Sequence, residues 1–303
     1  MRPEPLDGTY GHLRSLTRPE FDVLVEWAAA EGWNPGRHDA ECFWATDPEG
    51  FVGVEVDGQL AAGGSIVSYE RRYGFMGFFI VRSDLRGRGI GRSLWHERKR
   101  ILLSRLEPGA PIGMDGVFAM EPFYARGGFV REHRELRFEA PPDRSRSPQP
   151  THSPSEAAPD RVIVPACDIP LQRLTAFDSR HFPAPRPDFI RRWIAMPGAL
   201  ALAALSGGLL SGLAVARPAM RGMRVGPLFA DAPGLAEDLL ARILDDCAGE
   251  PVQIDVPERN AEAMRLAAQY GMREVFGCAK MTFGKPPDLP WDRIYGVTSL
   301  ELG

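Results

Sequence analysis

Hydrophobic and polar positions in the first 140 residues alternate between helical and extended patterns. Residues 18–33 predict an amphipathic helix, whose apolar face carries Phe21, Leu24, Val25 and Ala28. Residues 50–70 predict a hairpin, because Asp57-Gly58 is a favourable two-residue turn between two apolar runs. The patterns that follow predict a strand at 73–81, a helix at 91–106, a strand at 112–117, a short helix at 121–128 and a strand at 129–139.

The second half of the chain repeats much of this order. Residues 199–219 predict a second hairpin, which turns at Gly207-Gly208. Around it, the patterns predict helices at 168–183, 187–196, 234–249 and 259–271 and strands at 223–230, 251–257 and 272–284. The order β-β-β-α-β-α-β therefore occurs twice, which indicates an internal repeat of element pattern.

A segment rich in proline and serine separates the two halves. Residues 141–160 have no apolar periodicity, and we interpret them as a linker. The chain would then hold a domain at 1–140 and a second at 161–303, each long enough to bury a core of its own. Residues 288–303 follow the repeat, and their apolar side chains predict packing on the body of the protein.

Composition limits the class of protein. The net charge of −4 argues against broad nucleic-acid binding, so a basic site would have to be local. The longest apolar stretch, residues 197–216, is interrupted by three glycines, and we expect no membrane span or signal peptide. The four cysteines form no CxxC pair and the six histidines have no metal-ligand spacing, which favours a cytoplasmic protein without a metal. We expect a monomer or a homodimer, and the sequence does not distinguish the two.

The stretch VRSDLRGRGIGRSL, residues 81–94, combines a strand, a glycine-rich turn and the start of a helix. The free N–H groups and the dipole of a helix N-terminus attract anions, and glycines allow a phosphate to approach the backbone. Arg86, Arg88 and Arg92 would add charge-assisted contacts. A dinucleotide fingerprint would need a third glycine where Arg92 stands, and the Gly-Lys-Ser/Thr of a nucleoside triphosphate loop is missing.

The spacing Arg86-x-x-Gly89-x-Gly91 resembles the (Gln/Arg)-x-x-Gly-x-(Gly/Ala) signature of the GCN5-related N-acetyltransferases, the GNAT superfamily. The element order of residues 12–140 is also similar to that family. The resemblance implies an α/β fold with a mixed sheet (α+β), in which a splayed pair of strands holds acetyl-CoA. In this interpretation the cofactor-binding residues are Phe79, Ile80, Val81, Arg86, Gly87, Arg88, Gly89, Ile90, Gly91 and Arg92, and Tyr124 protonates the leaving thiolate.

The second half departs from this pattern at its equivalent turn. LFADAPGLAEDLL has no arginine but carries Asp231, Glu237 and Asp238, and carboxylates at a helix start would repel phosphate. Ala267 stands where the tyrosine would fall. We therefore expect two tandem GNAT-like domains, the second degenerate. GPLFAD, DVPERNAEAM and YGVTSLELG resemble tandem GNAT proteins with a YitH/HolE-type C-terminal domain.

The predicted function is transfer of an acetyl group from acetyl-CoA to an amine, on a small molecule or a protein. Such a reaction needs an aligned donor, a neutral amine, an oxyanion stabiliser and an acid for the thiolate. Asp115 and Asp39 are candidate bases or acceptor ligands, and Glu121, His38, Glu41 or an ordered water remain alternatives. A non-catalytic acyl-CoA sensor is the second hypothesis, and a nucleotide enzyme that uses the same turn for phosphate is the third.

Overall fold

The computed structural model describes residues 11–142 and 161–303, which fold into two β-sheets flanked by helices. The smaller sheet is antiparallel and has the order β1 (His12–Ser15), β2 (Phe51–Val56), β3 (Gln59–Ser65) and β6 (Ile80–Val81). The larger sheet is mixed and has the order β4 (Val67–Tyr69), β5 (Tyr73–Phe75), β7 (Ile112–Val117), β14 (Arg273–Phe283), β8 (Val130–Ala140), β13 (Val252–Pro257), β12 (Met223–Ala230), β11 (Leu209–Pro218), β10 (Leu200–Ser206) and β9 (Arg161–Pro165). A short strand, β15 (Ile294–Gly296), pairs with β12 beside this row. The mixed α/β architecture agrees with the prediction.

Both predicted hairpins form, and their turns explain why. Asp57 and Gly58 join β2 to β3 with φ of 52° and 73°, so both residues adopt the left-handed conformation of a tight two-residue turn. Gly207 and Gly208, with φ of 55° and 75°, do the same between β10 and β11. Glycine accepts this conformation without a steric penalty, which fixes the register of each hairpin.

The helices cover the sheets and bury the faces that the sequence predicts. In α1 (Arg18–Ala30) the buried side chains are those of the predicted apolar face. The helices α3 (Ile90–Arg105) and α4 (Glu121–Arg126) belong to the first half, and α5 (Leu171–Asp178), α6 (Pro187–Ile194), α7 (Pro233–Asp246) and α8 (Ala261–Gln269) to the second. A further helix that the sequence patterns do not predict, α2 (Asp39–Thr46), packs against α6 across the two halves.

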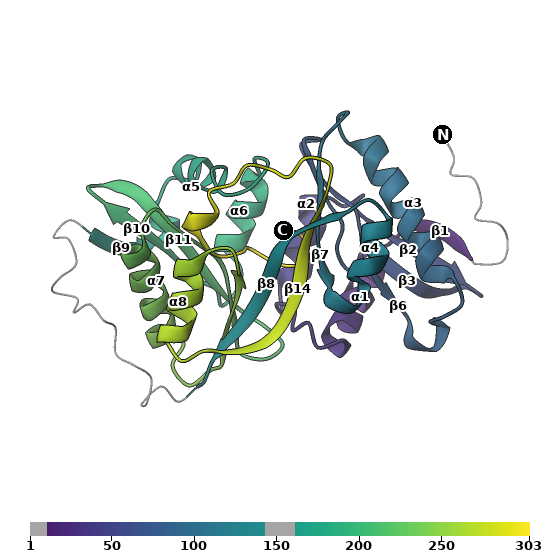
Figure 1. Cartoon of the computed structure of the whole chain (residues 1–303). Coiled ribbons are helices and arrows are strands. Elements are labelled where there is room, and N and C mark those ends of the chain that lie inside the picture. The colour runs from purple at the N-terminus through teal and green to yellow at the C-terminus, as the bar shows by residue number, and fades with distance from the viewer. Residues whose placement is uncertain (1–10, 143–160) are drawn as a thin grey trace.

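The two halves exchange their long final strands. From the first half, β8 pairs with β13 of the second, whereas β14 from the second half lies between β7 and β8. Figure 1 shows β8 and β14 side by side across the middle of the molecule. Within the described residues, 11–140 and 161–303 are therefore interleaved in space, and the predicted linker at 141–160 lies almost wholly outside what is described.

The predicted strand at 73–81 is two strands in different sheets. Its first part, β5, runs parallel to β7, with Gly74 opposite Ile112 and Phe75 opposite Gly113. The backbone then bulges at Phe78, whose φ is 50°, and the second part, β6, pairs with β3 instead. The expectation of one continuous strand was wrong, because an apolar run does not reveal a left-handed residue within it. The bulge separates β6 from β7.

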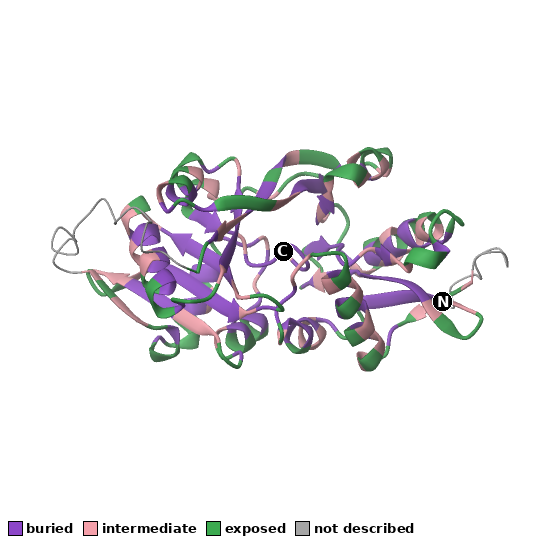
Figure 2. Ribbon diagram, turned by 90° about the horizontal axis from the view of Figure 1, so that it is seen from below, coloured by how far each residue is buried: buried purple, intermediate pink, exposed green. Residues whose placement is uncertain are grey.

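Buried side chains continue from one half into the other. One cluster joins α1, α2, α5 and α6, and in it the rings of Phe43 and Trp193 stack with centroids 5.8 Å apart. β15 and the segment after it are buried as well, including Tyr295 and Leu302, and residue 303 lies at the centre of the molecule (Figure 2). The expectation that residues 288–303 pack on the body is confirmed.

Candidate active site

A cavity of about 540 Å³ opens beyond the point where β5 stops pairing with β7 and the chain continues as β6. One wall is the bulged strand from Met76 to Val81, and the opposite wall comes from β7, with Met114, Asp115 and Val117. The glycine-rich turn lies at one end and α4 contributes Phe123 and Tyr124. Two strands that pair and then diverge thus make a cleft that contains exposed backbone edges, on which an extended ligand can lie.

The glycine-rich turn forms the start of α3 as the sequence predicts. Gly87 and Gly89 have φ of 78° and 84°, and Gly89 is the residue that caps the helix. At Gly91 a β-carbon would lie 3.1 Å from a methyl group of Val81, so a larger residue would narrow the space between turn and strand. Unpaired N–H groups of a helix start beside glycines form an anion site.

Arginine side chains surround this turn. The Nε of Arg86 donates to the carbonyl oxygen of Val81 at 3.0 Å, and its guanidinium also pairs with Glu31. Arg86 and Arg92 line the cavity, whereas Arg88 is exposed and does not. The predicted cofactor-binding residues that line the cavity are Phe79, Ile80, Val81, Arg86, Gly87, Gly89, Ile90, Gly91 and Arg92.

Tyr124 faces the same cavity from α4. Its ring packs against Trp95, with centroids 4.9 Å apart, and it is 4 % exposed. Burial raises the pKa of the Tyr124 hydroxyl to about 12. A β-carbon at Gly116 of β7 would lie 2.5 Å from the tyrosine ring, so the glycine makes room for this side chain. A protonated hydroxyl in a dry site is a hydrogen-bond donor.

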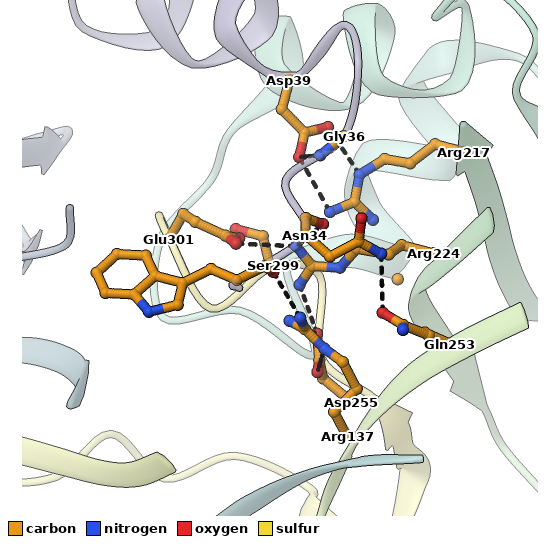
Figure 3. Close-up of polar contacts among 12 residues, drawn as sticks. Asn34, Gly36, Asp39, Arg137, Arg217, Arg224, Gln253, Asp255, Ser299 and Glu301 are labelled. Atoms are coloured by element: carbon orange, nitrogen blue, oxygen red, sulfur yellow. Dashed lines mark hydrogen bonds and ion pairs between the residues drawn. The ribbon is translucent and has the colours of Figure 1, made fainter. Parts of the chain in front are cut away.

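The two aspartates predicted as catalytic occupy different environments. Asp115 lines the cavity and lies 3.7 Å, from Oδ1 to Nζ, from the buried Lys280 of β14. Burial raises the pKa of Asp115 well above its usual range, although Lys280 opposes the shift. Asp39 does not line the cavity: its fully buried carboxylate accepts two hydrogen bonds from Arg217 of β11, at 2.8 and 3.2 Å, and one from the N–H of Gly36. Asp39 therefore joins the two halves (Figure 3), and its carboxylate is engaged in this contact, outside the cavity.

The bulge that opens the cavity is held by a residue that the sequence analysis did not select. Arg98 of α3 is fully buried, and its Nη2 donates to the carbonyl oxygens of Ser65 and Gly77 at 2.6 and 2.7 Å. Burial lowers its pKa to about 9. These two hydrogen bonds connect Ser65 of β3 to Gly77 in the bulge through the Arg98 side chain. Arg98 therefore stabilises the divergence of β6 from β7.

Comparison with known proteins identifies the fold. Residues 12–129 match the family model described as "Acetyltransferase (GNAT) family", and residues 174–296 match "Acetyltransferase (GNAT) domain". The two matches together cover most of the chain. The chain belongs to the GNAT superfamily. It is a tandem GNAT protein, and its membership supports an N-acetyltransferase enzyme over a non-catalytic acyl-CoA sensor.

Individual relatives cover almost the whole length of this tandem GNAT protein. The holothin acyltransferase of Pseudoalteromonas sp. (strain SANK 73390) is 29% identical over 285 residues, which are 94% of this chain and 92% of that protein. A solved structure from Pyrococcus horikoshii has a TM-score of 0.79 at 21% identity and covers 100% of this chain and 99% of its own. A tandem GNAT protein from the clavulanic acid biosynthesis pathway has a TM-score of 0.61 at 15% identity, covering 91% and 99%.

The second GNAT domain contributes residues to the first domain's cavity. Phe276 and Cys278 of β14 and Leu300 and Glu301 of the segment after β15 line it, together with Arg137 of β8. The sequence analysis missed all five. The apolar character of residues 288–303 was a signal that they pack somewhere, but periodicity cannot tell which surface they cover.

The corresponding cleft in the second GNAT domain is filled by the chain itself. There β12 and β13 run parallel from Met223 opposite Val252 to Val225 opposite Ile254. Beyond this point β15 pairs with β12, with Leu228 opposite Gly296, and the N–H of Val297 donates to Asp255 O at 2.9 Å. A protein strand thus occupies the gap between the diverging strands, which explains physically why this domain is degenerate.

The described residues 11–142 and 161–303 contain no group of three or more His, Cys, Asp or Glu side chains arranged to hold a metal ion. Within the same two ranges, each helix is too short or too polar to cross a membrane.

Proposed function

We propose that the first GNAT domain transfers an acetyl group from acetyl-CoA to an amine by direct attack on the thioester. The observation that supports this most is the divergence of β6 from β7, with the glycine-arginine turn at one end of the resulting cavity. The pyrophosphate of coenzyme A would bind residues 86–92, and the pantetheine arm would lie along Phe79, Ile80 and Val81. The cavity volume is in the range typical of cofactor sites.

In the proposed reaction, the amine nitrogen forms a bond to the carbonyl carbon and the carbon–sulfur bond breaks. A backbone N–H between Phe79 and Val81 would stabilise the oxyanion, as such donors do in acyl transfer. Tyr124 would donate its proton to the thiolate, which leaves as coenzyme A. The proton that the amine releases would pass to Asp115, which lines the cavity beside Lys280, or to water.

The acceptor is proposed to be a small molecule carrying an amine. Side chains of both domains line the cavity, which suits a small acceptor better than a protein surface. The holothin acyltransferase relative supports a small-molecule acceptor, and holothin is one compound to assay. We also propose a cytoplasmic location, since no disulfide joins Cys42, Cys167, Cys247 or Cys278 in the part of the chain that the structure describes.

The test is calorimetric binding of acetyl-CoA, followed by a thiol-release assay over a panel of amines. We expect saturable binding at one site and release of coenzyme A that depends on the amine. Binding of ATP or NAD in place of acetyl-CoA would support the nucleotide hypothesis, and binding without turnover across the panel would contradict acyl transfer.

A further inference from the structure

We propose that the side chain of Glu301 binds the amino group of the acceptor, and that the acceptor is a small, largely apolar primary amine. The inference deepens the proposed function, and rests on it for the direction of acyl transfer. Glu301 comes from the second half of the chain, yet it lines the cavity of the first GNAT domain.

The path of the chain after β15 brings Glu301 to this place. After β15 fills the cleft of the second domain, residues 297–301 lie against two glycines, Gly226 of β12 and Gly77 at the bulge of the first domain. A β-carbon at Gly226 would lie 2.4 Å from the carbonyl oxygen of Thr298, and one at Gly77 would lie 2.0 Å from that of Glu301. Only glycine allows such approach of two backbones, so the segment is tightly placed against both strands.

The Glu301 carboxylate has one occupied oxygen and one free oxygen. Oε1 accepts a hydrogen bond from Nη1 of Arg224 at 2.8 Å, as Figure 3 shows. Oε2 is buried and has no hydrogen-bond partner, and the residue as a whole is 3 % exposed. A buried carboxylate oxygen without a donor costs free energy, which a ligand with an N–H group would recover.

The neighbouring cations are already engaged by Asp255. Arg224 donates to Asp255 Oδ2 at 2.6 Å as well as to Glu301. Arg137 donates from Nε and Nη2 to the same carboxylate, at 2.6 and 3.1 Å, and from Nη1 to the carbonyl oxygen of Trp33 at 2.6 Å. Two arginines thus face two carboxylates, and neither arginine offers the cavity a dedicated anion site. The atom beside them that still lacks a hydrogen-bond partner is Oε2 of Glu301, which is an acceptor.

Asp115 does not fill this role equally well. Its Oδ1 also lacks a hydrogen bond, but the ammonium group of Lys280 lies 3.7 Å away and compensates its charge. The charge of Glu301 is shared with an arginine that Asp255 also binds. We therefore assign the nitrogen of the acceptor to the free Oε2 of Glu301, and proton transfer to Asp115 beside Lys280.

The remaining wall predicts the body of the acceptor. The side chains that line the cavity away from the glycine-rich turn are mainly apolar: Trp33, Met76, Met114, Val117, Phe276 and Leu300. A compact apolar molecule with one amino group matches this combination, because its nitrogen can reach the carboxylate while its carbon frame is buried. Acceptors with a carboxylate or phosphate near the amine would be repelled.

The experiment compares the wild type with E301Q, in which the amide oxygen can still accept from Arg224 but the charge is removed. Saturation-transfer NMR would measure binding of a panel of small alkyl and aryl primary amines to the protein alone. Steady-state kinetics with acetyl-CoA would give kcat and KM for the best amine. We expect amine binding to weaken and KM to rise about tenfold, while the dissociation constant of acetyl-CoA stays within about twofold. E274Q, at an exposed site on β14, is the matched control and should leave every value unchanged.

The outcomes separate this proposal from the acyl-transfer proposal. If wild type binds amines and E301Q binds them equally, or if wild type binds none of the panel, the role of Glu301 is refuted whatever acetyl-CoA does. If amine binding depends on Glu301 but acetyl-CoA does not bind, the amine site stands and acyl transfer fails. E301A, with a thermal unfolding curve for each variant, distinguishes loss of a ligand contact from loss of folding.

Discussion

The two GNAT domains of this chain contain the same cleft in two states. In each, a pair of parallel strands runs together for a few residues and then diverges at a glycine-containing bulge. In the first domain the gap stays open and ends at a glycine-arginine turn. In the second, β15 pairs with β12 inside the gap, and the turn that follows carries Asp231. The two domains therefore share the splayed strands and differ in the open gap and in the turn, the two features to which we assign binding of acetyl-CoA.

The filled cleft has a consequence for the open one. Because β15 is anchored between β12 and β13, the residues that follow it are delivered to the first domain in a fixed position. A domain that has lost its own cleft can thus contribute wall residues to its neighbour. The exchange of β8 and β14 also brings residues of the second domain to this cavity. It places β14 beside β7, so that Phe276 and Cys278 line the cavity.

The largest expected effect comes from placing an acid in the open domain's turn, as the second domain has. Gly91 is helical, so Gly91→Asp puts a carboxylate at a helix start that tolerates it but faces the proposed pyrophosphate. We expect the dissociation constant of acetyl-CoA to rise about 1,000-fold, because like charges in contact cost several kcal/mol. Isothermal titration calorimetry measures it.

The matched control is Gly234→Asp, at the start of α7 in the second domain. It adds the same charge to a turn whose cleft is already filled, so acetyl-CoA binding should stay within about twofold of the wild-type value. If both variants lost the same affinity for acetyl-CoA, the turn of the second domain would also take part in binding. That result would contradict the proposed difference between the two domains.

The next largest effect concerns the contact between the domains. Asp39→Ala would leave Arg217 buried without its partner, and we expect the free energy of unfolding to fall by about 3 kcal/mol. Urea unfolding followed by circular dichroism measures the change. Asp188→Ala breaks the exposed pair with Arg191 and should cost less than about 0.5 kcal/mol. Since Asp39 lies outside the cavity, we expect kcat/KM per folded molecule to change little. A hundredfold fall would instead support the catalytic role that the sequence predicts for Asp39.

A smaller effect is expected when the proposed acid is removed from the open domain. Tyr124→Phe keeps the buried ring but deletes the proton donor, and we expect kcat to fall about 100-fold. Because burial raises the pKa of Tyr124 to about 12, the wild-type hydroxyl stays protonated and kcat should show no fall from this group up to pH 10. The assay is thiol release under saturating acetyl-CoA.

Tyr270→Phe is the corresponding control in the second domain. The Tyr270 hydroxyl is also buried and has no partner among the described residues, yet it belongs to the domain whose cleft is filled. Unchanged kcat in Tyr270→Phe would show that the fall of kcat in Tyr124→Phe does not come from the loss of any buried hydroxyl. If Tyr124→Phe retains full kcat, water protonates the thiolate.

Local sequence patterns were enough to predict much of this architecture. The hairpin turns at Asp57-Gly58 and Gly207-Gly208, the buried face of α1 and the glycine turn before α3 all depend on residues close in sequence. Their conformations follow from steric limits on φ and from helical periodicity, which a sequence displays directly. The degenerate second turn was visible for the same reason, since Asp231 stands where the first half has arginines.

Other features depend on residues distant in sequence, and these could not be predicted. Nothing local to β8 or β14 specifies that each should pair in the other half, because strand partners are set by tertiary packing. Glu301 is an unremarkable acid in its own sequence context, and it reaches the cavity only because β15 is anchored near Gly226. The contact of Asp39 was hidden for the same reason, since its partner Arg217 lies 178 residues away in the sequence.

The smallest expected effect distinguishes two arginines of the open domain's turn. Arg86 lines the cavity and Arg88 does not, although the sequence offered both as phosphate ligands. We expect Arg86→Gln to raise the dissociation constant of acetyl-CoA about tenfold, the value of one charge-assisted contact, and Arg88→Gln to raise it less than about threefold.

Since Arg86 also pairs with Glu31, the double variant Arg86→Gln/Glu31→Gln separates two causes of the weaker binding. If the double variant binds like wild type, Arg86 acts by neutralising Glu31; if the tenfold loss persists, it contacts the phosphate itself. Equal effects of Arg86→Gln and Arg88→Gln would mean that the ligand extends over the exposed side of the turn.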